Sequence, residues 1–391
     1  MKTDKKTDEK YMRRCIELAR RGEGVVNPNP MVGCVVVKEG EVIAEAWHKK
    51  FGEAHAERQA LTGLDDAEGA TLYVNLEPCC HTGKTPPCTD IIIEKRIKRV
   101  VVGSDDPNPL VAGKGIQILR DAGIEVVTGV LKKECDVLNE VFMCFISSHI
   151  PFIAVKYAMT IDGKIASSYG ESKWITSEGA RNHAQRLRRR YMAILAGIGT
   201  VAADNPMLNF RAPETDDPYI AKSDKDKRCQ PVRVIVDSKL SISPDAQVIK
   251  TAREYKTIIA CTSAGADDPK KEIIERAGAS VMVIPADDKG RVGIIALLKK
   301  LGSIGIDSVL VEGGAGVHGS FLEEYCAHRD NLQVDGPISR VYAYIAPKLI
   351  GGKEALAPVG GYGVHLADAM KMTDTEVKYL GEDILLSGRV R

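Results

Sequence analysis

The feature of this sequence that most constrains its fold is an alternation of short apolar strands with helices. In the first part of the chain the pattern predicts helices at 8–21, 55–62, 89–95 and 115–122, and strands at 31–38, 42–46, 71–75, 100–103 and 125–128. Alternation of this kind favours an α/β layer protein, in which helices cover both faces of a sheet.

A short polar stretch, Ser147-Ser148-His149-Ile150-Pro151, interrupts this pattern. The alternation then restarts, with strands predicted at 152–157, 193–196, 232–236, 257–261, 281–284, 308–311 and 341–345. A chain of 391 residues is long enough for two domains. We therefore expect one domain at 1–148 and a second at 149–391. Two segments, 212–230 and 327–339, are predicted to be mobile surface loops.

Composition limits the classes of partner. The formal net charge is only +1, whereas nonspecific binding to nucleic acid needs a basic footprint, so we expect no polynucleotide partner. No apolar run approaches the roughly 18 residues that cross a bilayer, and the charged N-terminus lacks a signal-peptide pattern. We therefore expect a cytoplasmic protein without membrane contact, whose ten cysteines stay mostly reduced.

Three residues form a candidate metal site: His55, Cys79 and Cys88. One imidazole and two thiolates suit zinc, and three protein ligands leave a fourth position for water, which is typical of catalytic zinc. Cys79 is preferred to its neighbour Cys80 because it directly follows Pro78. Cys88 lies where a helix is predicted to start, and a helix N-terminus stabilises a thiolate.

Glu57, two residues after His55, is the candidate general acid–base residue. It could take a proton from zinc-bound water and pass it to a ring nitrogen and a leaving amine. Zinc deaminases of nucleobases carry His-x-Glu followed by Pro-Cys-x-x-Cys, a spacing from which this chain departs. The alternative is a structural zinc knuckle in a nucleic-acid-binding protein, which would need Cys80 as a fourth ligand.

The second half contains two strand–glycine turn–helix units, at 194–206 and 309–320. The exposed N–H groups of such turns suit a phosphate. Gly314, Gly316 and Gly319 match the dinucleotide-binding pattern. The following strand, Arg340–Ala346, lacks the acidic residue of an ordinary Rossmann domain, so we expect a pyrophosphate cradle in another fold. Trp174, set among small polar residues, is either a cofactor contact or a packing residue.

The first half resembles the deaminase half of the bifunctional deaminase–reductases of riboflavin biosynthesis. The resemblance rests on the motifs at 27–33, 55–57, 77–88 and 106–115. It implies a cytidine-deaminase-like three-layer fold and a substrate that is a diaminopyrimidinone carrying a ribosylamino phosphate. It also implies that four further residues bind this substrate: Asn27, His48, His81 and Lys84.

The second half resembles the reductase half of the same family, through its motifs at 162–164, 172–177, 204–206, 237–238, 312–314 and 346–348. The resemblance implies a dihydrofolate-reductase-like fold that uses NADPH to reduce the ribosyl chain to ribityl. The implied cofactor contacts are Ala158, Trp174, Thr200, Asp204, Ser238, Gly314, Ala315, Gly316, Val317, His318, Gly319 and Ser320. The implied substrate contacts are Ser172, Arg188, Leu208, Arg211 and Glu312.

Several points stay open in the sequence. Asp162, Lys156 and Glu312 are all candidates for the proton donor of the reductase. No residue in the sequence indicates a preference for NADPH over NADH. The family implies a homo-oligomer, a dimer or tetramer. The alternative function is a zinc-dependent deaminase of another amino-pyrimidine, fused to an inactive reductase-like domain.

Overall fold

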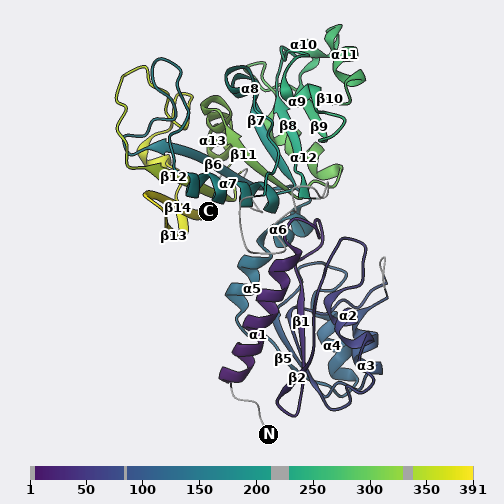
Figure 1. Ribbon diagram of the computed structural model, residues 1–391. Helices are drawn as coiled ribbons and strands as arrows, with labels where there is room; N and C mark the ends of the chain where they lie inside the picture. Colours follow the sequence, from purple (N-terminus) through teal and green to yellow (C-terminus); the bar gives the residue numbers. More distant parts are fainter. Residues whose placement is uncertain (1–4, 83–85, 213–228, 329–337, 391) are drawn as a thin grey trace. The chain divides into compact units, whose positions relative to one another are not determined.

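Two sheets organise the chain, one in each of the two units into which it divides, Met1–Ser148 and His149–Arg391 (Figure 1). The computed structural model describes residues 5–82, 86–212, 229–328 and 338–390. Within these ranges, none of the helices combines the length and apolarity that crossing a bilayer requires.

The first unit is built on a five-stranded sheet with the order β2-β1-β3-β4-β5. Strand β1 is antiparallel to both neighbours, whereas β3, β4 and β5 are parallel. The strands are β1 (Gly33–Lys38), β2 (Glu41–Trp47), β3 (Thr71–Leu76), β4 (Arg99–Ser104) and β5 (Glu125–Val127). The helices are α1 (Lys5–Ala19), η1 (Arg20–Gly22), α2 (Ala56–Thr62), α3 (Cys88–Glu94), α4 (Lys114–Asp121), α5 (Lys132–Leu138) and α6 (Glu140–Ser148).

Helices cover both faces of this sheet, which is why β1 is apolar along nearly its whole length. Val35 and Val37 pack with α1 and α5 in one core cluster. Cys34 and Val36 point to the other face, where they pack with α2, α3 and α4. The expected three-layer α/β arrangement is therefore confirmed.

The second unit has a nine-stranded sheet with the order β10-β9-β8-β7-β11-β6-β12-β14-β13. Neighbours are parallel from β10 through β12, and β14 is antiparallel to both β12 and β13. The strands are β6 (Phe152–Thr160), β7 (Ala193–Gly197), β8 (Val232–Val236), β9 (Thr257–Cys261), β10 (Ser280–Val283), β11 (Ser308–Gly313), β12 (Arg340–Ala346), β13 (Met372–Leu380) and β14 (Asp383–Val390).

Helices again lie on both faces of the second sheet, over two separate core clusters. They are α7 (Glu178–Arg190), α8 (Ile198–Asp204), α9 (Gln247–Lys250), α10 (Ser263–Ala266), α11 (Lys270–Arg276), α12 (Ile294–Ser303), α13 (Ala315–His328) and η5 (Leu366–Asp368). Because β6, β7, β8, β11 and β12 are parallel, their carboxyl ends meet at one edge, where ligands bind in open α/β sheets.

Three parts of the observed fold differ from, or lie beyond, the expectations. No element was predicted from the sequence for helices α5, α6, α9, α10, α11 and α12 or for the β13–β14 hairpin. Most of β13 is exposed on both faces, so it lacks the alternation that marks a half-buried strand. The loops expected at 212–230 and 327–339 fall largely outside the described residues.

Candidate active sites

Three elements of the first unit bring the predicted metal ligands together. His55 is the N-cap of α2, Cys79 follows the end of β3, and Cys88 is the first residue of α3. The Sγ atoms of Cys79 and Cys88 lie 3.4 and 3.6 Å from Nδ1 of His55. The three donor atoms all lie within 4.8 Å of one another. Two sulfurs and a nitrogen at this spacing fit a zinc ion, with one coordination position left for water.

The local electrostatics favour a thiolate at this site. A hydrogen bond from Cys88 and another from His55 lower the pKa of Cys79 to about 4. The main-chain N–H of Cys88 also donates to the sulfur of Cys79, over 3.4 Å. Cys80 points elsewhere, since its thiol donates to the main-chain oxygen of Leu110, 3.6 Å away. Cys79 therefore faces the candidate metal site, whereas Cys80 faces away from it.

Glu57 lies in the first turn of α2 and is 3% exposed. Its Oε2 atom is buried and has no hydrogen-bond partner among the described residues. Burial, reinforced by the nearby Cys79, raises the pKa of Glu57 to about 6. A carboxyl group with such a pKa exchanges protons readily near neutral pH, which is what a general acid–base residue requires.

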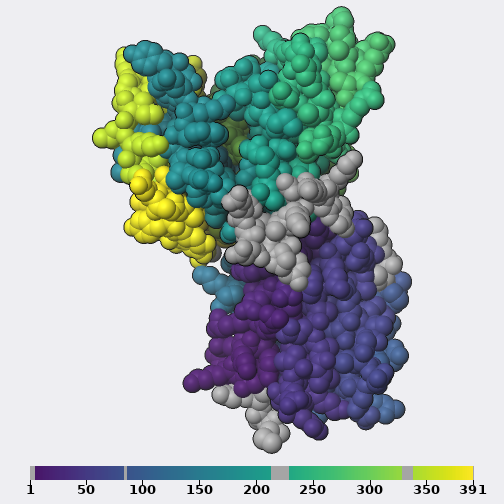
Figure 2. Space-filling model, in the orientation of Figure 1, coloured from purple at the N-terminus to yellow at the C-terminus, as the bar shows by residue number. Residues whose placement is uncertain are grey.

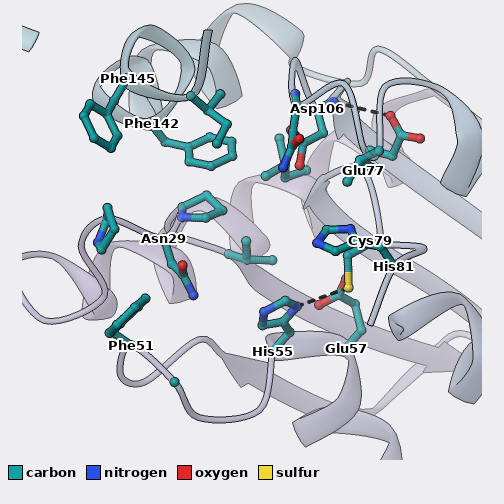
Figure 3. Close-up of a pocket in the computed structure, with 18 of the residues that line it drawn as sticks. Asn29, Phe51, His55, Glu57, Glu77, Cys79, His81, Asp106, Phe142 and Phe145 are labelled. Atoms are coloured by element: carbon teal, nitrogen blue, oxygen red, sulfur yellow. Dashed lines mark hydrogen bonds between the residues drawn. The ribbon is translucent and has the colours of Figure 1, made fainter. Parts of the chain in front are cut away.

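A cavity of about 340 Å³ opens beside the ligands (Figure 3). Its polar end holds His55, Glu57 and Cys79, and its far end is apolar, with Phe142 and Phe145 from α6. The complete described lining is Pro28, Asn29, Pro30, Val32, Phe51, Gly52, Glu53, His55, Glu57, Leu76, Glu77, Cys79, His81, Asp106, Asn108, Val111, Phe142, Phe145 and Ile146. An apolar pocket with a few polar groups at one end suits a small aromatic ring.

Two of the expected substrate contacts occupy a different place. Asn27 is not among the described lining residues, whereas Asn29 is. His48 is 1% exposed and sits behind Asn29, with its Nε2 3.2 Å from the Asn29 amide nitrogen and its Nδ1 3.2 Å from the Ala54 oxygen. Burial lowers the pKa of His48, which favours the neutral ring. His48 therefore orients Asn29 instead of facing the cavity.

The other two expected substrate contacts are His81 and Lys84. His81 lines the cavity, and its buried Nδ1 atom has no hydrogen-bond partner among the described residues. Near it lies Asp106, which the sequence reading did not select; burial raises its pKa to about 6. Lys84 lies outside the described residues.

A buried carboxylate fixes the wall that carries Asp106. Glu77 accepts hydrogen bonds from the main-chain N–H groups of Asp106, Gly113 and Ile116, at 3.4, 3.0 and 3.2 Å. Gly115 closes against Pro78 so tightly that a Cβ atom there would overlap the Pro78 oxygen. The Asp106-Pro-Asn108 motif was a usable signal for this wall, but nothing in the sequence marked Glu77 as its anchor.

The far wall depends on a second polar network. The side chain of Asn139, just before α6, accepts from the N–H of Met31 at 2.8 Å and donates to its oxygen at 3.0 Å. Asn75 also donates to that oxygen, at 3.0 Å. These bonds hold α6 against the segment that leads into β1, so that Phe142 and Phe145 face the cavity. Neither phenylalanine was among the site residues predicted from the sequence.

The second unit has its own cavity, of about 370 Å³, between β6, β12, α7 and the segments around Trp174 and Arg211. Its lining includes Ala158, Trp174, Arg188 and Arg211, which come from four separate segments. The other described lining residues are Lys156, Thr176, Glu178, Ala180, Arg181, Asn182, Ala184, Gln185, Ala212 and Tyr344. Four expected ligand contacts therefore meet at one pocket.

Arg188 is paired with Glu312 through two hydrogen bonds of 2.7 Å. Although burial alone would raise it, the pKa of Glu312 is held at about 2 by Arg188 and Lys156. The described residues provide no ion-pair partner for Lys156 or Arg211. The pocket therefore keeps positive charge that suits an anionic group such as a phosphate.

Other expected contacts gather at the carboxyl edge of the sheet. Gly314 packs close to Thr200, because a Cβ atom on Gly314 would lie 3.1 Å from the Thr200 hydroxyl. The hydroxyl of Ser172 donates to Asp204 over 3.3 Å. Gly314 directly precedes α13, which starts with Ala315 and Gly316 and whose first N–H groups suit a phosphate.

Three residues of the expected set have side chains that are engaged elsewhere, and a fourth, Gly319, has its main chain against another segment. The third pattern glycine, Gly319, packs against the loop at Gly360, where a Cβ atom would lie 2.5 Å from an oxygen. The ring of His318 is buried between the oxygens of Pro358 and Val311. Leu208 packs in a core cluster, so only its main chain could meet a substrate. The Ser238 hydroxyl accepts from Val292, at 3.0 Å.

The three candidate proton donors of the reductase lie in different environments. Asp162 accepts hydrogen bonds from Thr160 and from the main-chain N–H of Gly351, and the first of these lowers its pKa most. Asp162 is therefore a turn residue held as a carboxylate. Glu312 is committed to Arg188. Lys156 alone of the three lines the cavity, and burial lowers its pKa.

Comparison with protein families gives two matches along the chain. Residues 5–104 match the model of the cytidine and deoxycytidylate deaminase zinc-binding region. Residues 151–386 match that of the RibD C-terminal domain. The two matches fall on the two units and include the zinc-ligand candidates and the reductase-like pocket, respectively.

Individual relatives align over nearly their full length. The riboflavin biosynthesis protein RibD of Actinobacillus pleuropneumoniae is 50% identical over 97% of this chain and 94% of its own. That of Escherichia coli is 37% identical over 97% and 98%. Among solved structures, the diaminohydroxyphosphoribosylaminopyrimidine deaminase/5-amino-6-(5-phosphoribosylamino)uracil reductase of Thermotoga maritima has a TM-score of 0.82 at 38% identity, covering 99% of both chains. Acinetobacter baumannii RibD has a TM-score of 0.83 at 35% identity, covering 99% and 100%.

The two adjacent cysteines provide a test of the metal site. Cys79→Ser should lower bound zinc from about one ion per chain to nearly none, because it removes a thiolate ligand. Cys80→Ser is the matched control and should keep the ion, since its sulfur faces Leu110. Zinc is measured by inductively coupled plasma mass spectrometry on purified protein. Loss of zinc from Cys80→Ser alone would show that the ligands are wrongly assigned.

Proposed function

The chain belongs to the RibD family, the bifunctional deaminase–reductases of riboflavin biosynthesis, and on this premise we propose which residues carry each reaction. It has a zinc-binding deaminase domain and a reductase domain of the type that uses NADPH. We assign the deaminase to 1–148 and the reductase to 149–391. The substrate proposed for the first is the diaminopyrimidinone with a ribosylamino phosphate, as the name of the Thermotoga maritima relative indicates.

In the deaminase, His55, Cys79 and Cys88 hold the zinc ion. The ion, when bound, makes its water acidic enough to yield hydroxide near neutral pH. Glu57 would take one proton from that water and pass it to a ring nitrogen, and would later move the second proton, from the hydroxyl on the attacked carbon, to the departing amine. Water is consumed, the C–N bond breaks and ammonia leaves. The neighbouring polar groups Asn29, His81 and Asp106 orient the ring.

The observation that carries this proposal is the state of Glu57. Its buried Oε2 lacks a hydrogen-bond partner among the described residues, and its pKa is about 6. A buried polar atom without a partner is rare in a folded protein, and a ligand can supply the missing one. A carboxyl group that only stabilised the fold would be expected to have its oxygens paired.

Glu57→Gln tests the deaminase and leaves the reductase as an internal control. The amide cannot shuttle protons, so ammonia release should fall at least about 100-fold, while zinc content stays unchanged. NADPH oxidation with the deaminated substrate should remain at the wild-type rate. Undiminished ammonia release would refute the role of Glu57. Absence of NADPH oxidation in the wild type would favour the alternative, a deaminase with an inactive reductase-like domain.

For the reductase we propose that the second cavity holds the phosphorylated sugar. NADPH, when bound, would supply the hydride for C1′, and O4′ would take up a proton as the C1′–O4′ bond opens. Arg211 binds the phosphate, and Arg188, held by Glu312, adds positive charge. Trp174, Thr200 and the start of α13 face the cofactor. Lys156 is the proposed donor of the proton that O4′ takes up, because it is the one candidate of the three that lines the cavity.

The pH dependence of the reductase tests Lys156. Only the ammonium form donates a proton, so the rate falls as the pH rises through the pKa. Burial places that pKa below the 10.5 of a free lysine, so the fall should begin at lower pH. Lys156→Met should lower kcat by about 100-fold or more. Lys156→Arg keeps the charge but should also be slow, because arginine does not release its proton. A fully active Lys156→Arg variant would exclude the proton-donor role.

We also propose that the protein is a homo-oligomer. Two loops of the second unit, residues 161–169 and 349–366, form what we call the apolar arm. Main-chain hydrogen bonds join the two segments: the N–H of Ile161 donates to the oxygen of Lys348, and that of Ile165 donates to the oxygen of Leu356. In Figure 2 these blue-teal and yellow-green atoms lie together at one side of the unit. Tyr362 and Leu366 in the arm are 100% and 92% exposed. Apolar exposure concentrated in this way marks an interaction surface.

Light scattering coupled to gel filtration tests this surface. Leu366→Glu should shift the wild-type dimer or tetramer toward monomer, because a buried unpaired carboxylate opposes association. Ile273→Glu, at an exposed apolar position on α11, is the control and should keep the wild-type mass. A monomeric wild type, or an unaffected Leu366→Glu variant, would reject the proposal.

We further propose a cytoplasmic location. None of the ten cysteines, all within the described residues, forms a disulfide, which suits a reducing compartment, and two of them are proposed zinc ligands. Fractionation of cells with an antibody against the chain should recover it with soluble cytoplasmic proteins.

A further inference from the structure

Helix α7 presents a stripe of three polar side chains to the second cavity. Arg181, Gln185 and Arg188 follow the spacing i, i+4, i+7, which places them on one helix face. All three line the cavity. The exposed residue Arg186 belongs to another face of the same helix. The stripe is therefore directed at the reductase site.

Each residue of the stripe holds a different segment of that site. Arg188 pairs with Glu312 at the end of β11. The Oε1 atom of Gln185 accepts a hydrogen bond of 2.9 Å from the main-chain N–H of Arg211. The guanidinium group of Arg181 lies 4.5 Å from the ring centre of Trp174. One helix face thus contacts three segments that are far apart in the sequence.

The position of α7 is itself fixed at its N-terminus. The Ser177 hydroxyl accepts from the N–H of Ala180, at 3.4 Å, and donates to the Leu380 oxygen, at 3.1 Å. The main-chain N–H of Ser177 donates to the carboxylate of Asp383, at 2.6 Å. These bonds tie the helix to the turn between β13 and β14, so the stripe cannot slide along the cavity without breaking them.

Trp174 depends on such support because its side chain stands outside the core and the residue is 65% exposed. Arg181 covers the ring and also donates to the main-chain oxygen of Thr176, at 2.8 Å. Stacking of this kind at an exposed site favours one ring orientation about twofold to fivefold. The other contact in the stripe, from Gln185, acts on the main chain of Arg211 and so sets where its guanidinium group emerges.

We propose that Arg181 and Gln185 are positioning residues of the reductase, with separate tasks. Arg181 holds Trp174 against the nicotinamide cofactor, and Gln185 holds Arg211 toward the phosphate of the substrate. The inference rests on the cofactor role of Trp174 and the substrate role of Arg211 proposed above. It adds that α7 sets the two binding sites independently.

Steady-state kinetics of NADPH oxidation on the full chain test this with a crossed pattern. Arg181→Met keeps the aliphatic stem but removes the guanidinium group, so the KM for NADPH should rise about threefold to fivefold with the pyrimidine KM unchanged. Gln185→Met removes the acceptor at nearly constant volume, so the pyrimidine KM should rise by a similar factor with the NADPH KM unchanged. Arg181→Lys, which restores a cation over the ring, should recover part of the NADPH affinity.

Three comparisons separate this inference from general damage and from the proposed function. Arg186→Ala, on the exposed face of α7, should leave both KM values unchanged, and ammonia release should be normal in every variant. A rise of both KM values in either α7 variant, or of neither, would overturn the positioning roles. Trp174→Ala and Arg211→Ala serve as references: if they leave the respective KM values unchanged, it is the proposed site that fails.

Discussion

The direction of the parallel strands is the constraint on which both sites depend. In a parallel sheet the carboxyl ends of all strands lie at the same edge, so segments that are distant in sequence meet there. In the first unit, β3 ends just before Glu77 and Cys79, and its parallel neighbour β4 ends just before Asp106. In the second, β11 ends at Glu312 and Gly313, next to β6 and β7. The few side chains at these strand ends then determine the chemistry of each site.

The buried carboxyl groups at the two sheet edges have different electrostatic environments. At the first, Glu57 is desolvated beside a thiolate, which leaves the carboxyl group able to exchange its proton. At the second, Glu312 is fully engaged by Arg188 and remains a carboxylate. Burial alone disfavours the charged form in both cases, so the difference comes from the neighbouring groups. The same residue type therefore acts as a proton carrier in one unit and as a fixed counter-charge in the other.

The strands and the grouping of His55, Cys79 and Cys88 were predictable because their signals are local: apolar runs bounded by turns, and a histidine and cysteines beside prolines. Contacts made across the fold were not. His48 looks like a ring contact in the sequence, yet Asn29 stands in front of it. Leu208 fits the family pattern, yet its side chain belongs to the core. Arg181 lies in a helix rich in basic residues, of which the family resemblance selects only Arg188; the contact of Arg181 with Trp174 is visible only in the fold.

Helix α6 has a consequence for how the two activities can be separated. The match to the deaminase zinc-binding region ends at residue 104, but the apolar wall of the first cavity comes from Phe142, Phe145 and Ile146. A fragment cut at the edge of the family match would keep all the metal ligands and lack one side of the chamber. A fragment that keeps this wall must therefore include α6, which ends at Ser148.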